Sequence, residues 1–270
     1  MDGNQSPRKI SDRDVEAFDR DGVICLRGVL DAGWVERMRG AVERVMAKPS
    51  ARGGNFNKEA GTGRFFGDLW MWRFDPDFRA LAMESPLPAL AAQLMKSRKV
   101  NLVWDQLLVK EPHTPLPSPW HQDQPYAWTD GYQNCSFWCS LDPVTLENGA
   151  VEFIKGSHKG AWYQARSFHP ERRYESDEHT PMPDINADRS RYDIVHWDTQ
   201  PGDVVVHHLN TLHYAPGNNT DRRRRATAVR YAGDDATYAV RKNGPKLLHD
   251  PGIHPGDKLD CDLFPVVYRG

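Results

Sequence analysis

The sequence His121-Gln122-Asp123 places a histidine and a carboxylate two positions apart, directly after Pro119-Trp120. Side chains alternate along an extended segment, so His121 and Asp123 are expected on one face, at adjacent positions of a metal ion. A second histidine from a distant strand would complete the two-histidine, one-carboxylate set that leaves positions open on a non-haem Fe(II) ion. The spacing is weak evidence alone, because His196-Trp197-Asp198 repeats it in a polar segment, where we expect a structural or surface role.

Three histidines near a later apolar strand are candidates for the distant ligand: His207, His208 and His213. His207 and His208 are neighbours within the strand, so they face opposite ways and at most one of them points at a given site. His213 follows the strand beside a turn at 214–218, and a ligand at a strand end is easily aimed into the mouth of a barrel. Spacing alone leaves the choice among the three open.

Four consecutive arginines, Arg222 to Arg225, lead into a predicted strand at 224–231. Such a run is usually a solvated patch. Within the strand, however, Arg224, Ala226 and Ala228 share one face. An arginine beside small residues leaves room for a ligand carboxylate, which it binds through two parallel hydrogen bonds. Arg224 is therefore a candidate for holding a carboxylate.

The composition argues against several classes of function. The 270 residues include 35 lysines and arginines and 37 aspartates and glutamates, a net charge of −2, and a pI near 6.6 argues against a general nucleic-acid binder. A mean hydropathy of −0.70 without a long apolar run argues against a transmembrane span. The first residues, MDGNQSP, contain no apolar signal region, and none of the four cysteines forms a C-x-x-C pair. We expect free thiols in a reducing compartment, a cytoplasmic protein and no membrane partner.

The elements that must position these residues are predicted to form one domain over 1–270, with a helical layer and a β core. In the N-terminal layer, about 11–95, Ser11 and Asp31 are predicted to cap two helices, the first reaching about Asp19. A strand is predicted at 23–26 and a loop at 49–63. Short strands separated by turns occupy about 100–235 and indicate an antiparallel sandwich or barrel: 100–110, 135–141, 150–154, 204–208 and 224–231. The long polar segment at about 159–197 is predicted to be an insert or a lid.

An ordered series of motifs, within about residues 12–235, resembles a known family. The series comprises Trp120-His121-Gln122-Asp123, Trp138, Glu147-Asn148-Gly149-Ala150, Gly156-Ser157-His158-Lys159, Gly202-Asp203, His213, Asn218, Thr220 and Arg224. It resembles the phytanoyl-CoA dioxygenase family of Fe(II)- and 2-oxoglutarate-dependent oxygenases. The resemblance implies a mainly β fold with flanking helices around a double-stranded β-helix, the jelly-roll core of cupin-like proteins.

The resemblance also implies roles for residues at matching positions. His121, Asp123 and His213 match the iron ligands. Arg224 matches the arginine that pairs with the far carboxylate of 2-oxoglutarate. Ala215 stands where the family often has a hydroxyl residue, so one hydrogen bond to 2-oxoglutarate is expected to be missing. The other implied cosubstrate contacts are Trp138, Gln106 and Lys110.

The implied reaction is an oxidation that uses Fe(II), 2-oxoglutarate and O₂ and releases succinate and CO₂. Asp123 fills the position that a halide occupies in related halogenases, so hydroxylation is expected and not halogenation. We expect the hydroxylated, unactivated C–H bond to belong to a small polar metabolite, such as an amino acid, a betaine or an aminophosphonate. An acyl-CoA or a natural-product scaffold is the alternative substrate.

Aromatic residues predicted to border the site are candidate substrate contacts. They would form a cage for a cationic amine or an apolar slot, or belong to the core: Trp70, Trp72, Trp104, Tyr126 and Trp128. Two other functions stay open. A metal-dependent cupin enzyme that does not use 2-oxoglutarate would not need Arg224, and a jelly-roll binding module without catalysis would not need three convergent ligands. A small-molecule substrate is the expected partner, and the sequence leaves the oligomeric state open.

Overall fold

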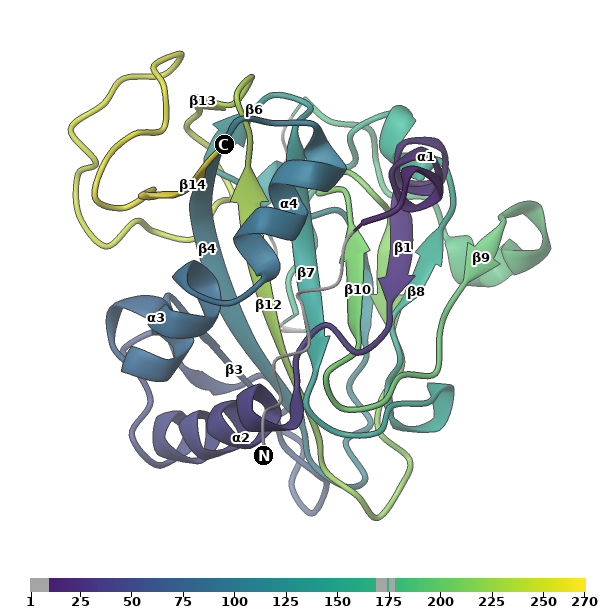
Figure 1. Ribbon diagram of the computed structural model, residues 1–270. Helices are drawn as coiled ribbons and strands as arrows, with labels where there is room; N and C mark the ends of the chain where they lie inside the picture. Colours follow the sequence, from purple (N-terminus) through teal and green to yellow (C-terminus); the bar gives the residue numbers. More distant parts are fainter. Residues whose placement is uncertain (1–9, 169–173, 175–177) are drawn as a thin grey trace.

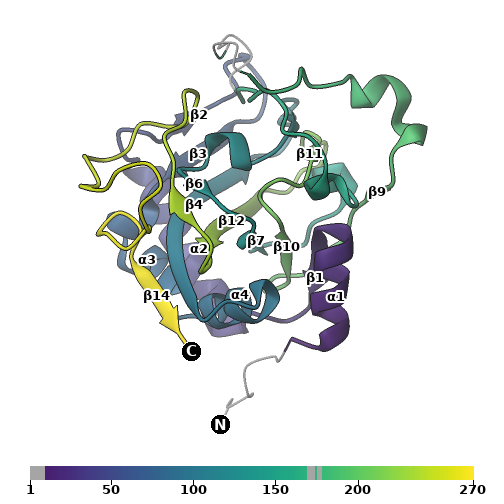
Figure 2. The same cartoon turned by 90° about the horizontal axis from the view of Figure 1, so that it is seen from above.

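The computed structural model describes residues 10–168, 174 and 178–270. In this part of the chain, a large antiparallel sheet faces a smaller one (Figures 1 and 2). The large sheet has eight strands in the order β1-β10-β7-β12-β4-β3-β2, and β14 also pairs with β4. Its strands are β1 (Val23–Leu26), β2 (Gly54–Asn55), β3 (Phe65–Leu69), β4 (Lys99–Lys110), β7 (Asn134–Ser140), β10 (Val204–His207), β12 (Arg224–Ala232) and β14 (Val266–Arg269).

The smaller sheet supplies the other wall of the jelly-roll. Its four strands run in the order β5-β11-β8-β9, and β6 and β13 form a separate two-stranded sheet. Their bounds are β5 (Ser118–His121), β6 (Thr129–Asp130), β8 (Glu152–Ile154), β9 (Ile194–Val195), β11 (His213–Ala215) and β13 (Thr237–Tyr238). The expected mainly β fold with flanking helices and a jelly-roll core is confirmed.

Helices cover the outer face of the large sheet and its β1 edge (Figures 1 and 2). They are α1 (Asp12–Asp21), α2 (Ala32–Ala47), α3 (Pro76–Met83) and α4 (Leu87–Met95). Ser11 and Asp31 cap α1 and α2 as predicted, because each side chain accepts a hydrogen bond from a backbone N–H of the first turn. Helix α1 runs two residues past the predicted end at Asp19 and stops at Gly22, whose φ of 73° favours glycine.

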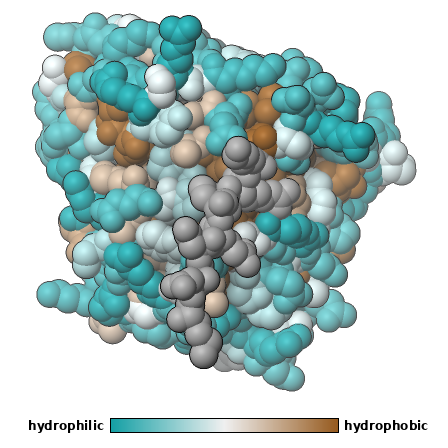
Figure 3. Space-filling model, in the orientation of Figure 1, coloured by the Kyte–Doolittle hydropathy of each residue, from teal (hydrophilic) through white to brown (hydrophobic). Residues whose placement is uncertain are grey.

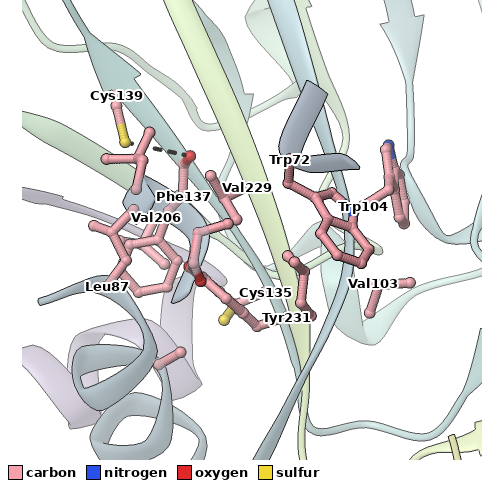
Figure 4. Packing of buried hydrophobic residues seen from close by; sticks show 14 of the residues in the cluster. Trp72, Leu87, Val103, Trp104, Cys135, Phe137, Cys139, Val206, Val229 and Tyr231 are labelled. Atoms are coloured by element: carbon pink, nitrogen blue, oxygen red, sulfur yellow. Dashed lines mark hydrogen bonds between the residues drawn. The ribbon is translucent and has the colours of Figure 1, made fainter. Parts of the chain in front are cut away.

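The main hydrophobic core lies between these helices and the large sheet. Leu87 of α4 belongs to the same buried cluster as Phe137, Val206 and Tyr231 of three strands (Figure 4). Cys139 is also in this cluster, and its thiol contacts the Phe137 carbonyl oxygen at 3.7 Å. The four cysteines are free thiols, as expected. The large sheet therefore has one face against helices and leaves the other face for the site.

The polar segment 159–197 is only partly a loop, and its residues 169–173 and 175–177 lie outside the described ones. It contains the 3₁₀ helix η5 (Ile185–Arg191) and β9, which extends the smaller sheet beyond β8. Asn186 of η5 accepts a hydrogen bond from the Trp120 indole at 3.0 Å, and Arg189 forms an ion pair with Glu152. The part of the segment that contains η5 and β9 is thus attached to the smaller sheet on its outer side.

The face of the molecule in Figure 1 is mostly hydrophilic, with hydrophobic side chains in small separate patches (Figure 3). No helix within the described residues is long and apolar enough to cross a lipid bilayer.

Candidate active site

A cavity of about 470 Å³, counting its opening to solvent, lies between the two sheets. One wall is formed by alternate residues of β4, β7, β10 and β12, and the other by β5, β8 and β11. Their side chains reach it because residues of one face recur at every second position. The cavity is lined by five of the seven residues expected to bind iron or 2-oxoglutarate: Gln106, His121, Trp138, His213 and Arg224.

Three potential metal ligands converge at this cavity. His121 ends β5, His213 begins β11, and the two are direct partners in the register of the smaller sheet. Their imidazole rings have centroids 4.0 Å apart. One ligand atom each from His121, Asp123 and His213 lies within 4.8 Å of the others, and all three residues are buried.

Asp123 reaches the group by a different route from the one predicted. It is not on an extended segment but just past the end of β5, with φ −77° and ψ −29°, where the 3₁₀ helix η2 (Gln124–Tyr126) begins. The N–H groups of Asp123 and Gln124 both donate to the Leu209 carbonyl oxygen, at 2.8 and 2.9 Å. This turn, and not strand alternation, fixes the carboxylate beside His121.

The two histidines of this group present unprotonated nitrogens to the cavity. Nδ1 of His121 lies 2.7 Å from the Pro119 carbonyl oxygen, and Nδ1 of His213 lies 2.9 Å from that of Thr211. A carbonyl oxygen only accepts, so each Nδ1 carries the proton and each Nε2 keeps its lone pair. Burial lowers the pKa of both imidazoles to about 3. Two neutral imidazoles and a carboxylate suit a divalent iron ion.

Arg230, which the sequence analysis missed, is bound to the carboxylate of this group. Its Nε and Nη2 lie 2.9 and 3.2 Å from the two oxygens of Asp123, and Nη2 also donates to Gln106 at 3.0 Å. Burial opposes ionisation of Asp123, but Arg230 and the nearby imidazoles outweigh it and hold the pKa of the carboxyl below its usual range. The alternation that selected Arg224, Ala226 and Ala228 also reaches Arg230, two residues further along β12.

Arg224 lies at another part of the cavity wall and is buried without a carboxylate partner. Its Nη1 donates to the Leu108 carbonyl oxygen at 3.3 Å, its Nε has no hydrogen-bond partner, and Trp138 lies 5.6 Å from its Cζ. Burial lowers the pKa of this guanidinium to about 10. A buried cation with an unused donor fits the carboxylate of a bound ligand.

Of the other two implied cosubstrate contacts, Gln106 lines the cavity, whereas Lys110 does not. The Lys110 ammonium donates to the carbonyl oxygens of Pro216 and Ala215, and it lies 4.7 Å from the Phe65 ring centre. Burial, together with the charge of Arg224, lowers the pKa of Lys110 well below its ordinary value. Lys110 thus holds the chain just after β11, and it is not among the cavity-lining residues.

The other two histidine candidates, His207 and His208, point to opposite sides, as strand alternation requires. His207 lines the cavity, with Nε2 3.9 Å from Oδ2 of Asp123 and its ring 4.5 Å from that of His213. His208 faces the other way and contacts the Tyr132 carbonyl oxygen at 2.8 Å. His196 is exposed, as expected.

Ser118 and Phe168 are among the cavity-lining residues that the sequence analysis did not recognise. Ser118 is the register partner of Ala215 across β5 and β11, and both line the cavity. Phe168, from the polar segment, lines the cavity and lies edge-on to His121, with ring centres 5.0 Å apart. Ser118 was missed because β5 contains a proline and shows no alternation of polar and apolar residues. Phe168 was missed because the polar segment shows no such pattern either.

The aromatic residues expected near the substrate are mostly placed in the core. Trp70, Trp72 and Trp128 are buried in the main cluster and are not among the cavity-lining residues. Trp104 belongs to the same cluster and lies 4.6 Å from the guanidinium carbon of Arg230. Tyr126 lies at the edge of His121, with ring centres 6.3 Å apart. Core packing explains the three buried tryptophans.

Sequence relatives were found among curated proteins. A profile of the family described as phytanoyl-CoA dioxygenase (PhyH) matches residues 18–226. The chain is 27% identical over 127 residues to a probable phytanoyl-CoA dioxygenase of Caenorhabditis elegans, which covers 47% of this chain and 39% of that protein. It is 30% identical over 133 residues to a probable alpha-ketoglutarate-dependent hypophosphite dioxygenase of Stutzerimonas stutzeri, which covers 47% of this chain and 43% of that protein. The matches span less than half the length of these two relatives.

Solved structures give matches over nearly the whole chain. The non-haem alpha-ketoglutarate-dependent carbocyclase SnoK from nogalamycin biosynthesis has a TM-score of 0.78 and 26% identity, covering 98% of this chain and 100% of that one. The epimerase SnoN in complex with Fe³⁺, alpha-ketoglutarate and nogalamycin RO has a TM-score of 0.73 and 22% identity, covering 94% and 97%. Because the family profile spans most of the sequence and the jelly-roll fold agrees with it, the chain belongs to the phytanoyl-CoA dioxygenase family of non-haem iron, 2-oxoglutarate-dependent oxygenases.

Proposed function

We propose that this protein hydroxylates an unactivated C–H bond of a small polar metabolite, with Fe(II) held by His121, Asp123 and His213 and 2-oxoglutarate held at Arg224. When bound, iron, 2-oxoglutarate and O₂ supply the oxidising power for such a bond, and 2-oxoglutarate leaves as succinate and CO₂. The observation that carries the proposal is that His121, His213 and a buried arginine without a carboxylate partner line one cavity, with a ligand atom of Asp123 within 4.8 Å of those of the two histidines.

The chain's own residues prepare this site in three ways. The carbonyl oxygens of Pro119 and Thr211 fix the imidazole tautomers, so that the two Nε2 atoms are ready to bind metal. The Arg224 guanidinium offers a two-point contact to the far carboxylate of 2-oxoglutarate, with Trp138 beside it. Phe168 covers His121 on the side of the polar segment and restricts the access of water.

A small substrate agrees with a cavity that 2-oxoglutarate must share. The cavity must accommodate 2-oxoglutarate at Arg224 as well as the substrate, so the part of the substrate that reaches the metal site is expected to be small. An acyl-CoA would have to leave most of its length outside. The hypophosphite dioxygenase among the relatives is named for a small anionic substrate.

A second candidate is the oxidation of a natural-product scaffold at the same metal site. It is favoured by the match to the carbocyclase from nogalamycin biosynthesis, which covers 98% of this chain at 26% identity. This alternative requires the bulk of the scaffold to lie outside the cavity, with one C–H bond directed inward.

The two candidates are separated by succinate formation in the presence of O₂. The iron-loaded protein is given 2-oxoglutarate with an amino acid, a betaine, an aminophosphonate or nogalamycin, and succinate is compared with the rate without added compound. We expect a small polar compound to raise the rate in the wild type and not in His213→Ala. Stimulation by nogalamycin alone would support the second candidate. Iron binding without succinate under any condition would contradict both and favour a cupin enzyme that does not use 2-oxoglutarate.

A further inference from the structure

The carboxylate of Asp123 is held by a buried arginine from a different strand. Both its oxygens accept from the Arg230 guanidinium, Oδ2 from Nε at 2.9 Å and Oδ1 from Nη2 at 3.2 Å. The two side chains are 4% and 5% exposed, so water does not compete for these hydrogen bonds. Arg230 itself is fixed by Gln106, whose Oε1 accepts from Nη2 at 3.0 Å, and by the ring of Trp104.

This pairing occupies one edge of the carboxylate. A guanidinium that donates in parallel to both oxygens uses the lone pairs that the two oxygens direct to the same side. A metal ion chelated by both oxygens would need those same lone pairs. With Arg230 in place, each oxygen of Asp123 keeps only its outer lone pair. These two lone pairs point to opposite sides, so a single metal ion can bind only one of the oxygens.

Structural stabilisation alone does not account for this ion pair. Removing two charges from water costs several kcal/mol per ion, roughly what their attraction returns, and the Nη1 of Arg230 is buried without a hydrogen-bond partner. An apolar pair would fill the same space without that cost. The ion pair between Arg230 and Asp123 is explained if it fixes the orientation of the Asp123 carboxylate.

We propose that Arg230 is a positioning residue that restricts Asp123 to metal binding through a single oxygen, so that a coordination position stays open for the cosubstrate. The inference rests on the proposed function, because it concerns the same metal site. Arg230 also lines the cavity, but the role proposed for it is exerted through the Asp123 carboxylate.

The test compares Arg230→Gln and Arg230→Lys with Arg225→Gln. Arg225 is the matched control. It lies on β12 like Arg230 and donates to both oxygens of Asp142, at 3.0 and 2.7 Å, but it is not a cavity-lining residue. Fe(II) dissociation constants are measured anaerobically by titration. The visible charge-transfer band of the iron–2-oxoglutarate complex is then recorded at saturating iron and cosubstrate. Circular dichroism confirms that each variant is folded.

For Arg230→Gln we expect a roughly 10- to 100-fold weaker affinity for Fe(II), the usual cost of losing a partner of a metal ligand, and a shifted or weakened band at saturation. Arg230→Lys retains the charge but not the two-point contact, so we expect an intermediate affinity and the same direction of band change. Arg225→Gln should match the wild type in both measurements.

Wild-type affinity and an unchanged band in a folded Arg230→Gln would overturn the inference. If that variant does not fold, the same unchanged result in Arg230→Lys would overturn it. A wild-type protein that forms no band at all would instead contradict the proposed function, so the two failures are distinguishable.

Discussion

At the scale of single residues, Arg224 carries the clearest expectation for the cosubstrate. Its guanidinium is buried, its Nε has no hydrogen-bond partner among the described residues, and the neighbouring carboxylate of Asp142 is paired with Arg225. Replacing it with alanine removes a hydrogen bond to a charged group, worth about 1.5–3 kcal/mol, and should weaken 2-oxoglutarate binding roughly 10- to 100-fold. The measurement is the KM for 2-oxoglutarate in succinate formation. A larger change in the KM of the primary substrate than in that of 2-oxoglutarate would show that Arg224 has another role.

The hydroxyl group that is missing at Ala215 is present on the opposite strand. Ser118 is the register partner of Ala215, and both line the cavity. We expect Ser118→Ala to weaken 2-oxoglutarate binding by roughly the 0.5–1.5 kcal/mol of a typical hydrogen bond, with Fe(II) affinity unchanged. Anaerobic titration of the iron-loaded variant measures it, with Ser157→Ala, away from the cavity lining, as the control. Equal 2-oxoglutarate affinity in wild type and Ser118→Ala would leave the hydroxyl without a cosubstrate role.

At the scale of elements, β12 carries Arg224 and Arg230 at the two ends of one face, and the small residues between them leave the cavity open. Ala228 lines the cavity, whereas Val229 points into the main core on the other face. Ala228→Leu should fill the space and abolish 2-oxoglutarate binding, whereas Val229→Leu should leave that binding unchanged. Each overpacked variant should lose roughly 1–3 kcal/mol of stability. Titration of both variants decides the point, and a normal cosubstrate affinity in Ala228→Leu would contradict the placement of the site.

The sequence predicted the elements with regular patterns and missed those without one. Strands β4, β7 and β12 were predicted because their apolar residues recur continuously or at every second position. Strand β5 was missed since Pro119 removes a backbone donor, which an edge strand tolerates. The same limit applies to the site. Residue types and spacing selected His121 and Arg224, but the turn on Leu209 and the pairing of Arg230 depend on contacts between distant segments.

At the scale of the whole molecule, buried histidines make stability depend on pH. Burial lowers the pKa of His121 and His213 to about 3 and of His207 and His208 to about 4. In the unfolded chain these groups titrate near 6.5. Between about pH 6.5 and 4 the unfolded state therefore binds protons that the folded state does not. The free energy of unfolding falls as the pH is lowered, by at most about 1.4 kcal/mol per pH unit for each histidine. Asp105 partly offsets this, because burial raises its pKa to about 8.

We therefore expect the metal-free protein to unfold at a lower urea concentration at pH 5 than at pH 7. His208→Gln should reduce the difference, since this buried histidine lies away from the cavity, and the exposed His196→Gln should not. Equal unfolding midpoints at the two pH values would show that the buried imidazoles take up protons in the folded state.

The most direct test of the central claim is an anaerobic titration of the metal-free protein with Fe(II) and then with 2-oxoglutarate, followed by visible absorption. If His121, Asp123 and His213 hold iron and the cosubstrate chelates it in the same cavity, a charge-transfer band appears with 2-oxoglutarate. The band is then absent from His213→Ala and needs far more 2-oxoglutarate in Arg224→Ala. Tight iron binding without a band at any 2-oxoglutarate concentration would contradict the claim and leave a metal site of a different chemistry.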